Sequence, residues 1–225
     1  MVKDKIVFTI DLNKDYEEVS LVGVEIHKNG HYIKKNIEYD SLIKVLNNSS
    51  ISKHYFSASV PENSYYIFEE NEWYGCIFFV KGRKLPLVYS CNETEHFIVP
   101  YPNMLFKVTA MEGGSVSCNV YAIKDEKICD STRLYQFPFS NVSKVGHVCF
   151  GGNDIHFSEP KALAADCKKL VEAFFSSPYN GDYYTSDYTS LLEPDLKKLI
   201  STLSEYDVFP DILVDKGITA KDLIN

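Results

Sequence analysis

Residues 134–152 read Leu-Tyr-Gln-Phe-Pro-Phe-Ser-Asn-Val-Ser-Lys-Val-Gly-His-Val-Cys-Phe-Gly-Gly and are the most informative stretch of the chain. Asn141 lies eight residues before Cys149, and Gly146 lies three residues before it. The wider segment, about residues 132–158, follows neither the helical nor the strand period. Long irregular segments inside compact domains are often functional, so we expect the chemistry of the protein here.

The residues before this segment predict mostly strands. Asn29-Gly30 and Glu112–Gly114 are turn signals, and we expect an antiparallel meander over about residues 55–123. A short helix is expected behind an N-cap at Asp40 or Ser41, with an apolar face of Leu42, Ile43, Val45 and Leu46. The predicted strands are 21–27, 31–37, 65–68, 73–80, 85–89, 96–99, 105–108 and 116–121.

The residues after it predict helices. One helix opens near Ser158–Pro160 and another near Glu193-Pro194, and a short helix is expected at residues 220–224. Strands followed by helices indicate an α+β fold, an antiparallel meander sheet packed by helices. The predicted division is an N-terminal β-hairpin extension, residues 1–38, and a main domain, residues 39–225. The apolar positions with a 3.6-residue period are Leu163, Cys167, Leu170, Val171 and Phe174, and then Leu196, Leu199, Ile200 and Leu203.

Composition narrows the class of partner. Lysine and arginine number 23 against 31 aspartates and glutamates, so the formal net charge is −8. This balance argues against a sequence-independent nucleic-acid binder, which needs cations to neutralise phosphates. The longest apolar runs, Cys76–Val80 and Pro86–Tyr89, are far shorter than the roughly 20 residues that cross a bilayer. We therefore expect neither a nucleic acid nor a membrane as partner.

The start of the chain predicts a reducing compartment. The first ten residues lack the apolar stretch and cleavage site of a secretory signal, so we expect a cytoplasmic protein. Its cysteines should then be free thiols, and the absence of a Cys-x-x-Cys pair argues against a structural zinc site. The six cysteines are Cys76, Cys91, Cys118, Cys129, Cys149 and Cys167.

The central segment resembles the active-site stretch of ubiquitin-conjugating enzymes, in which a His-Pro-Asn triplet is followed by a glycine, an aliphatic residue and the catalytic cysteine. Asn141, Gly146, Val148 and Cys149 fall on those positions. The resemblance is closer still to prokaryotic ubiquitin-conjugating-like family D, also described as protein B of the PRTRC plasmid cassette. It covers about residues 96–180, and the motifs that carry it are Leu134-Tyr135, Pro138-Phe139, Asn141-Val142, Gly146, Val148-Cys149, Gly151 and Phe174–Ser177.

The resemblance implies a ubiquitin-conjugating-enzyme-like fold and a conjugating enzyme. Cys149 would accept a ubiquitin-like protein as a thioester from a ThiF-type activating enzyme and pass it to an acceptor. A JAB-type metallopeptidase is a further partner that the resemblance implies. Thioester exchange needs an accessible thiolate, and no metal or organic cofactor is expected.

One position departs from the pattern. Phe139 stands where conjugating enzymes have the histidine of the triplet, and Ser140 stands where they have its proline. Family D is known to lack that histidine. Asn141 is then either the donor to the oxyanion of acyl transfer or a scaffold for its own loop.

Alternatives remain open. The chain is either a conjugating enzyme or a catalytically inactive module of the same fold that binds a ubiquitin-like protein or scaffolds its partners. A hydrolase using Cys149 and His147 is a third reading, since alternation places both on one face of an extended segment. Asp154 and His156 could line the acceptor side or be solvated. The tyrosines that could form a docking surface or pack within a loop are Tyr179, Tyr183, Tyr184 and Tyr188.

Overall fold

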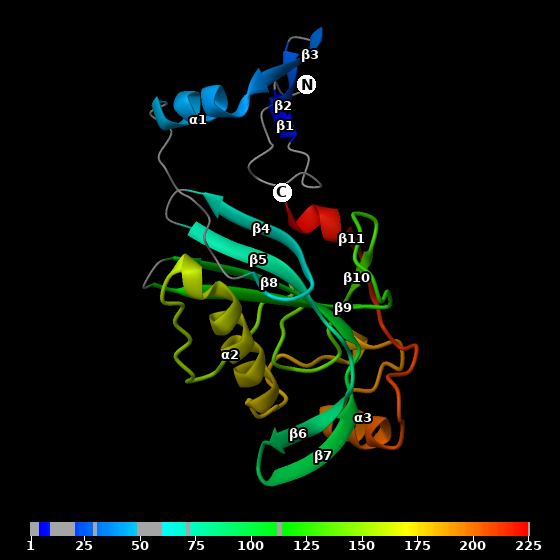
Figure 1. Ribbon diagram of the computed structural model, residues 1–225. Helices are drawn as coiled ribbons and strands as arrows, with labels where there is room; N and C mark the ends of the chain where they lie inside the picture. The colour runs from blue at the N-terminus through cyan, green and yellow to red at the C-terminus, as the bar shows by residue number, and fades with distance from the viewer. Residues whose placement is uncertain are drawn as a thin grey trace. The chain divides into compact units, whose positions relative to one another are not determined.

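The chain folds into two compact units, residues 1–55 and 56–225 (Figure 1). The computed structural model describes residues 5–9, 21–28, 31–48, 60–70, 73–111 and 114–224. The predicted division at residue 38 stays a prediction. No helix within these described ranges is long and apolar enough to span a membrane.

The described residues of the first unit form a three-stranded antiparallel sheet and one helix. The strands β1 (Lys5–Thr9), β2 (Leu21–Lys28) and β3 (His31–Glu38) lie side by side in that order. Lys28 pairs with His31, and the turn predicted at residues 29–30 lies outside the described residues. Strand β1 was not predicted from the sequence.

Helix α1 (Tyr39–Asn48) follows β3 directly. The predicted N-caps Asp40 and Ser41 lie inside the helix, so the predicted start is late by two or three residues. Leu42 is buried as predicted, whereas Ile43 is exposed. The side chains of residues 45 and 46 lie outside the described residues.

The second unit is built on a six-stranded antiparallel sheet with the order β11-β10-β9-β8-β5-β4. The short outer strands β10 and β11 were not predicted from the sequence. The bounds are β4 (Ser64–Glu70), β5 (Trp73–Val80), β8 (Asn103–Met111), β9 (Val116–Ile123), β10 (Arg133–Tyr135) and β11 (Asp215–Thr219).

The strands between β5 and β8 leave this sheet. β6 (Lys84–Ser90) and β7 (Thr94–Pro100) form a separate two-stranded sheet, while β5 pairs with β8 (Figure 1). The predicted meander is therefore interrupted by a hairpin excursion. Pro86 is tolerated there because no described strand pairs with the other edge of β6, which bonds to Tyr179 only at Val88 and Ser90.

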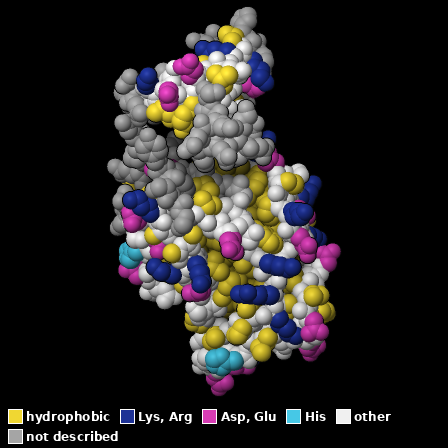
Figure 2. All heavy atoms as spheres, viewed as in Figure 1, with side chains coloured by type: hydrophobic (Ala, Val, Ile, Leu, Met, Phe, Trp, Pro, Cys, Tyr) yellow, Lys and Arg dark blue, Asp and Glu magenta, His cyan; other side chains and the backbone are white. Residues whose placement is uncertain are grey.

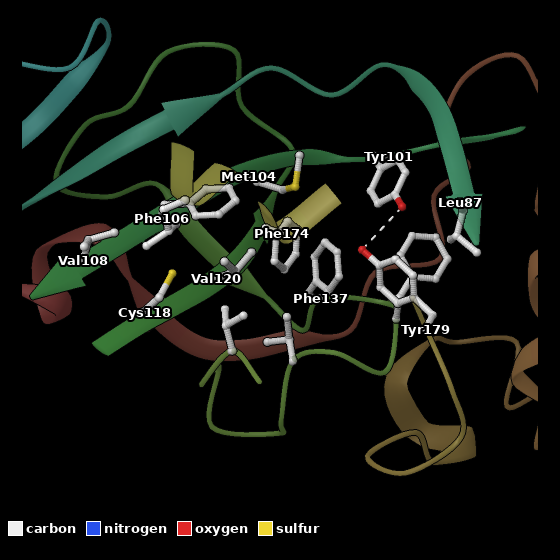
Figure 3. Packing of buried hydrophobic residues seen from close by; sticks show 14 of the residues in the cluster. Leu87, Tyr101, Met104, Phe106, Val108, Cys118, Val120, Phe137, Phe174 and Tyr179 are labelled. Atoms are coloured by element: carbon white, nitrogen blue, oxygen red, sulfur yellow. Dashed lines mark hydrogen bonds between the residues drawn. The ribbon is translucent and has the colours of Figure 1, made fainter. Parts of the chain in front are cut away.

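Both faces of the main sheet are covered, which explains its long apolar strands. On β8, Phe106 and Val108 belong to one cluster of buried residues, and Leu105 belongs to the other. The first cluster holds most of the core, including the rings in Figure 3. The second cluster packs η4 (Ala220–Leu223), a 3-10 turn where a short helix was predicted.

Helices α2 and α3 bury the faces that their periodicity predicts, and α3 lies against β7. Helix α2 (Leu163–Ser176) is preceded by the 3-10 turn η2 (Pro160–Ala162), and four of its five predicted core positions are buried, with Val171 half-buried. In α3 (Leu196–Ser204) all four predicted positions are buried. The Asp195 side chain caps α3 by accepting the N–H of Lys197 at 2.9 Å and that of Lys198 at 3.3 Å. Figure 2 shows charged and hydrophobic side chains interspersed on the described surface.

Phe174 joins α2 to the sheet, and its removal tests the core. Its ring lies 5.3 Å from that of Phe106 and 5.4 Å from that of Phe137, in edge-to-face contacts. Phe174→Ala should lower the free energy of unfolding by about 3–5 kcal/mol in urea titration. Lys168→Ala, on the exposed face of the same helix, should change it by less than about 0.5 kcal/mol. Equal effects would contradict this packing.

Candidate functional site

The segment from Asn141 to Cys149 folds back on itself as a short antiparallel ladder. The N–H of Cys149 donates to the carbonyl oxygen of Asn141 at 2.8 Å, and the N–H of Ser143 donates to that of His147 at 2.9 Å. Val142 and Val148 face each other between these bonds and are buried. The eight-residue spacing is therefore the register of a hairpin, and it places Asn141 directly opposite Cys149.

A glycine is required at the turn of this hairpin. Gly146 has φ +90, and a Cβ atom there would lie 2.7 Å from carbon atoms of the Tyr121 ring. The Tyr121 hydroxyl donates to the carbonyl oxygen of Val145 at 3.1 Å. The ring therefore packs where a side chain would be and holds the turn in place.

The hairpin is attached to the main sheet. The N–H of Val148 donates to the carbonyl oxygen of Cys118 at 2.9 Å, and the N–H of Val120 donates to that of Gly146 at 2.8 Å. Residues 146–148 thus extend the sheet beside β9. Cys149 follows a hydrogen-bonded strand, which positions it more rigidly than a free loop would.

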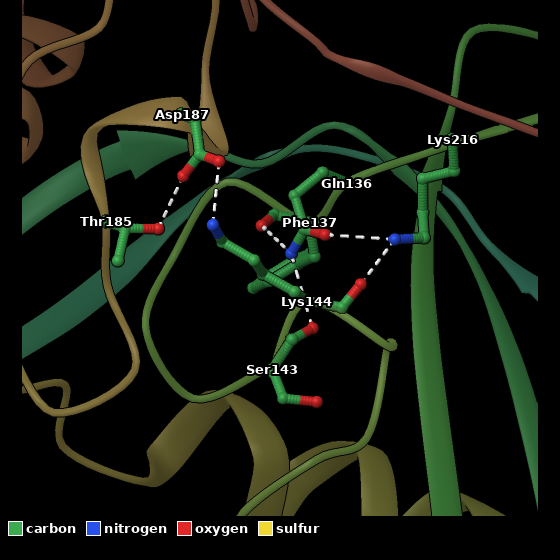
Figure 4. Close-up of polar contacts among 7 residues, drawn as sticks. All are labelled: Gln136, Phe137, Ser143, Lys144, Thr185, Asp187 and Lys216. Atoms are coloured by element: carbon green, nitrogen blue, oxygen red, sulfur yellow. Dashed lines mark hydrogen bonds and ion pairs between the residues drawn. The ribbon is translucent and has the colours of Figure 1, made fainter.

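Polar contacts hold the tip of the hairpin (Figure 4). Lys144 Nζ lies 2.7 Å from a carboxylate oxygen of Asp187, which lowers the pKa of that carboxyl. Lys216, on β11, donates to the carbonyl oxygen of Lys144 and, at 3.3 Å, to Gln136 Oε1. Burial lowers the pKa of Lys216. Gln136 Nε2 donates to the carbonyl oxygen of Ser143 at 3.4 Å.

Phe139 anchors the strand that bears Asn141. Its side chain is buried, and its ring makes edge-to-face contacts with Tyr101 at 5.2 Å, Phe137 at 5.6 Å and Tyr179 at 5.7 Å. Where conjugating enzymes have a histidine, this chain therefore holds the loop by aromatic packing.

The loop after α2 forms the facing wall. Asn141 Nδ2 donates to the carbonyl oxygen of Pro178 at 3.2 Å. Tyr179 is bound to β6 through two backbone hydrogen bonds of 2.8 Å, with Val88 and Ser90. The Tyr101 hydroxyl donates to that of Tyr179 at 3.4 Å (Figure 3). The β6–β7 hairpin thus braces the wall that Asn141 contacts.

Between hairpin and wall lies a pocket of about 410 Å³. Cys149 and Asn141 both line it, so the structure brings the two predicted site residues together. Gly151 and Gly152 line it as well, and a Cβ atom on either would meet no heavy atom within 4 Å. Asp182 is the one charged side chain among the described residues of its lining.

Cys149 is an exposed free thiol, and exposure alone does not single it out. All six cysteines are free, and Cys91 and Cys129 are exposed too. Hydrogen bonds from Ser131 and Thr132 lower the pKa of Cys129. The three buried thiols differ: Cys76 Sγ lies 3.6 Å from Cys167 Sγ, and burial raises the pKa of Cys118. Cys149 differs from the other two exposed cysteines, Cys91 and Cys129, because it lines this pocket.

Other predicted residues lie apart from this pocket. His147 is exposed and is not among the described residues that line it. Asp154 and His156 form an exposed ion pair of 2.8 Å, and the hydrogen bond that the imidazole donates to the Asp154 carboxylate raises the pKa of His156. Both are solvated. Of the four loop tyrosines, only Tyr183 is exposed and lines the pocket, while Tyr179, Tyr184 and Tyr188 are packed.

Several polar residues of the pocket were not identified from the sequence. Ser177 and Asn180 belong to the far wall, and Asn153 Nδ2 donates to Ser177 Oγ at 3.3 Å. The sequence singles out Ser140 only as a departure from the conjugating-enzyme pattern. The far wall is brought in by tertiary contacts, and no local pattern marks it.

Substitution of Gly146 tests the geometry of the hairpin turn. Gly146→Ala should lower the free energy of unfolding by about 1–3 kcal/mol or more, because the positive φ and the contact with Tyr121 both oppose a side chain. Gly152→Ala, which meets open space, is the control and should have little effect. Chemical denaturation measures both. Gly146→Ala as stable as Gly152→Ala would contradict the close approach of Tyr121.

Comparison with known proteins agrees with this geometry. No curated protein and no solved structure matches the sequence. The model of one protein family, Prokaryotic E2 family D, matches residues 38–212. This match spans most of the chain and includes the hairpin, the pocket and both main helices. The resemblance identified from the sequence is thereby confirmed, and the α+β architecture with its antiparallel sheet fits an E2-like fold. The chain belongs to prokaryotic E2 family D.

Proposed function

We propose that the chain is a conjugating enzyme that carries a ubiquitin-like protein as a thioester on Cys149. The observation that supports this most strongly is the pairing of Asn141 with Cys149 across the hairpin, with both side chains on one pocket. The exposed thiol is accessible to a large partner, and the open space beside Gly151 and Gly152 leaves room for an extended tail.

The chemistry has two acyl transfers. The Cys149 thiolate attacks the carbonyl carbon of a donor thioester, and the donor's sulfur leaves as a thiolate. An acceptor amine then attacks the new thioester, loses a proton, and displaces Cys149 as a thiolate. Each step passes through a tetrahedral intermediate with a negative oxygen, which a nearby N–H donor stabilises. Asp182 is on the wall of this pocket, and its carboxylate attracts a protonated amine, which loses a proton to water before its lone pair attacks the thioester.

Asn141 can act both as scaffold and as donor. Its side-chain amide carries two N–H groups, and one of them bonds to the carbonyl oxygen of Pro178. The second N–H remains for an oxyanion on the acyl group. The first bond fixes the amide against the far wall, so the donor is oriented before the substrate arrives.

The partners in this proposal are a ThiF-type activating enzyme, which supplies the thioester, and a ubiquitin-like protein, which is the cargo. A JAB-type metallopeptidase is the third proposed component. The alternative is an inactive module that only binds the ubiquitin-like protein. This alternative predicts that Cys149 is buried and unreactive. The exposure of that thiol favours the enzyme.

Cys149 variants test the proposal. The chain is incubated with ATP, a ThiF-type activating enzyme and a ubiquitin-like protein from the same genome, and intact masses are measured. Wild type should gain the mass of the cargo minus one water, and thiol reductant should remove it. Cys149→Ala should show no gain, whereas Cys149→Ser should form an ester that resists the reductant.

Cys91→Ala and Cys129→Ala are matched controls, because these two thiols are also exposed. Both should load as wild type does. An adduct lost in either control and retained in Cys149→Ala would refute the assignment. If no variant loads while the activating enzyme and cargo react with each other, the inactive module is the better account.

Asn141→Asp tests the donor. Aspartate has nearly the same size but no N–H to donate when ionised. Discharge of preloaded chain to a small amine should slow by about 100- to 1,000-fold, as when an oxyanion donor is removed elsewhere. Single-turnover discharge followed by mass measures it, with Asn141→Ala alongside. If both variants discharge the thioester at the wild-type rate, Asn141 acts only as a scaffold.

A further inference from the structure

Ser140 has a buried hydroxyl without a hydrogen-bond partner. The residue is 1% exposed, and its Oγ makes no hydrogen bond to any part of the chain that the structure describes. Ser140 directly precedes Asn141 and lines the same pocket as Cys149. Native structures pair nearly all buried polar atoms, and an exception in a pocket calls for a functional explanation.

The other polar side chains near it are already paired. Ser177, the other buried serine of the pocket, donates its hydroxyl proton to the carbonyl oxygen of Ala173 at 2.7 Å. Asn153 donates to Ser177 Oγ, and Asn180 donates to Asp182 at 2.8 Å. Among the described residues, Ser140 therefore has the one buried hydroxyl of the pocket whose proton is uncommitted.

We propose that the Ser140 hydroxyl donates a hydrogen bond to the carbonyl oxygen of the acyl group on Cys149, as a second donor beside Asn141. The inference rests on the proposed function and adds a residue to its machinery. Rotation about χ1 moves a serine oxygen among three staggered positions, so a bound carbonyl can recruit the hydroxyl without backbone movement.

The role follows each acyl transfer. When a thiolate or amine attacks the carbonyl carbon, its C–O π pair moves onto oxygen, and the O–H of Ser140 and the N–H of Asn141 both point to that negative charge. As the C–S bond breaks, the pair returns to the carbonyl and the sulfur leaves as a thiolate. Ser140 keeps its proton throughout. The hydrogen bond from Ser140 strengthens as negative charge develops on the carbonyl oxygen, so it stabilises the transition state more than it stabilises the thioester.

The test separates carbonyl chemistry from thiol reactivity. Wild type, Ser140→Ala, Ser140→Thr and Ser176→Ala are compared; Ser176 is exposed and lies outside the lining of the pocket. Three quantities are measured: single-turnover discharge of the thioester to a small amine, alkylation of Cys149 by iodoacetamide, and thermal stability. Alkylation forms no oxyanion, so it reports on the thiol alone.

Ser140→Ala should discharge on the order of 100-fold more slowly, with unchanged alkylation. Ser140→Thr, which keeps a hydroxyl, should recover part of the rate, and Ser176→Ala should behave as wild type. Since Ser140→Ala removes an unpaired buried hydroxyl, its melting temperature should equal or exceed that of wild type.

A clear fall in the melting temperature of Ser140→Ala would show that the hydroxyl has a structural partner and would overturn the inference. Unchanged discharge, or equal slowing of discharge and alkylation, would overturn it as well. If wild type itself forms no thioester, the proposed function fails first. The melting temperature still tests the unpaired hydroxyl in that case.

Discussion

The backbone hydrogen bond from Cys149 to Asn141 is the contact on which the proposed site depends. It closes a hairpin whose other edge is bonded to β9, so the position of the cysteine is set by the main sheet. The same register points Val142 and Val148 into the core and leaves Asn141 and Cys149 to the pocket. Gly146 makes the turn possible because Tyr121 fills the space of a side chain.

The chain holds Asn141 and Cys149 in place without the histidine of the conjugating-enzyme triplet. Phe139 replaces a polar anchor by three aromatic contacts, and these contacts need no particular protonation state. The excursion of β6 and β7 adds a second support, because β6 binds Tyr179 through the backbone and so places Pro178 where Asn141 reaches it.

Local features were predictable from the sequence, and non-local ones were not. The face of α3, with Leu199, Ile200 and Leu203 buried, follows from a period that needs only neighbouring residues. Every strand predicted between residues 65 and 121 is present as well. The pairing of β5 with β8 is a choice among partners distant in sequence, and no pattern in either strand encodes it. The start of α1 at Tyr39 was missed because Asp40 and Ser41 resemble caps.

The candidate site divides in the same way. Asn141, Gly146 and Cys149 lie within nine residues, so the resemblance to conjugating enzymes identified them from the sequence, whereas the hairpin that pairs Asn141 with Cys149 was not predicted. Pro178 comes from the loop after α2 and meets Asn141 only through tertiary folding. Burial likewise depends on tertiary contacts, and the unpaired hydroxyl of Ser140 could be recognised only in three dimensions.

The most direct measurement is to find where a cargo is attached in the cell. The chain is purified from its bacterial host after an acid quench, digested without reductant, and mapped by mass spectrometry. The account predicts a thiol-labile adduct, the C-terminal peptide of a small protein, on the peptide that contains Cys149. Such an adduct on Cys91 or Cys129, or a Cys149 peptide found only as the free thiol, would contradict it.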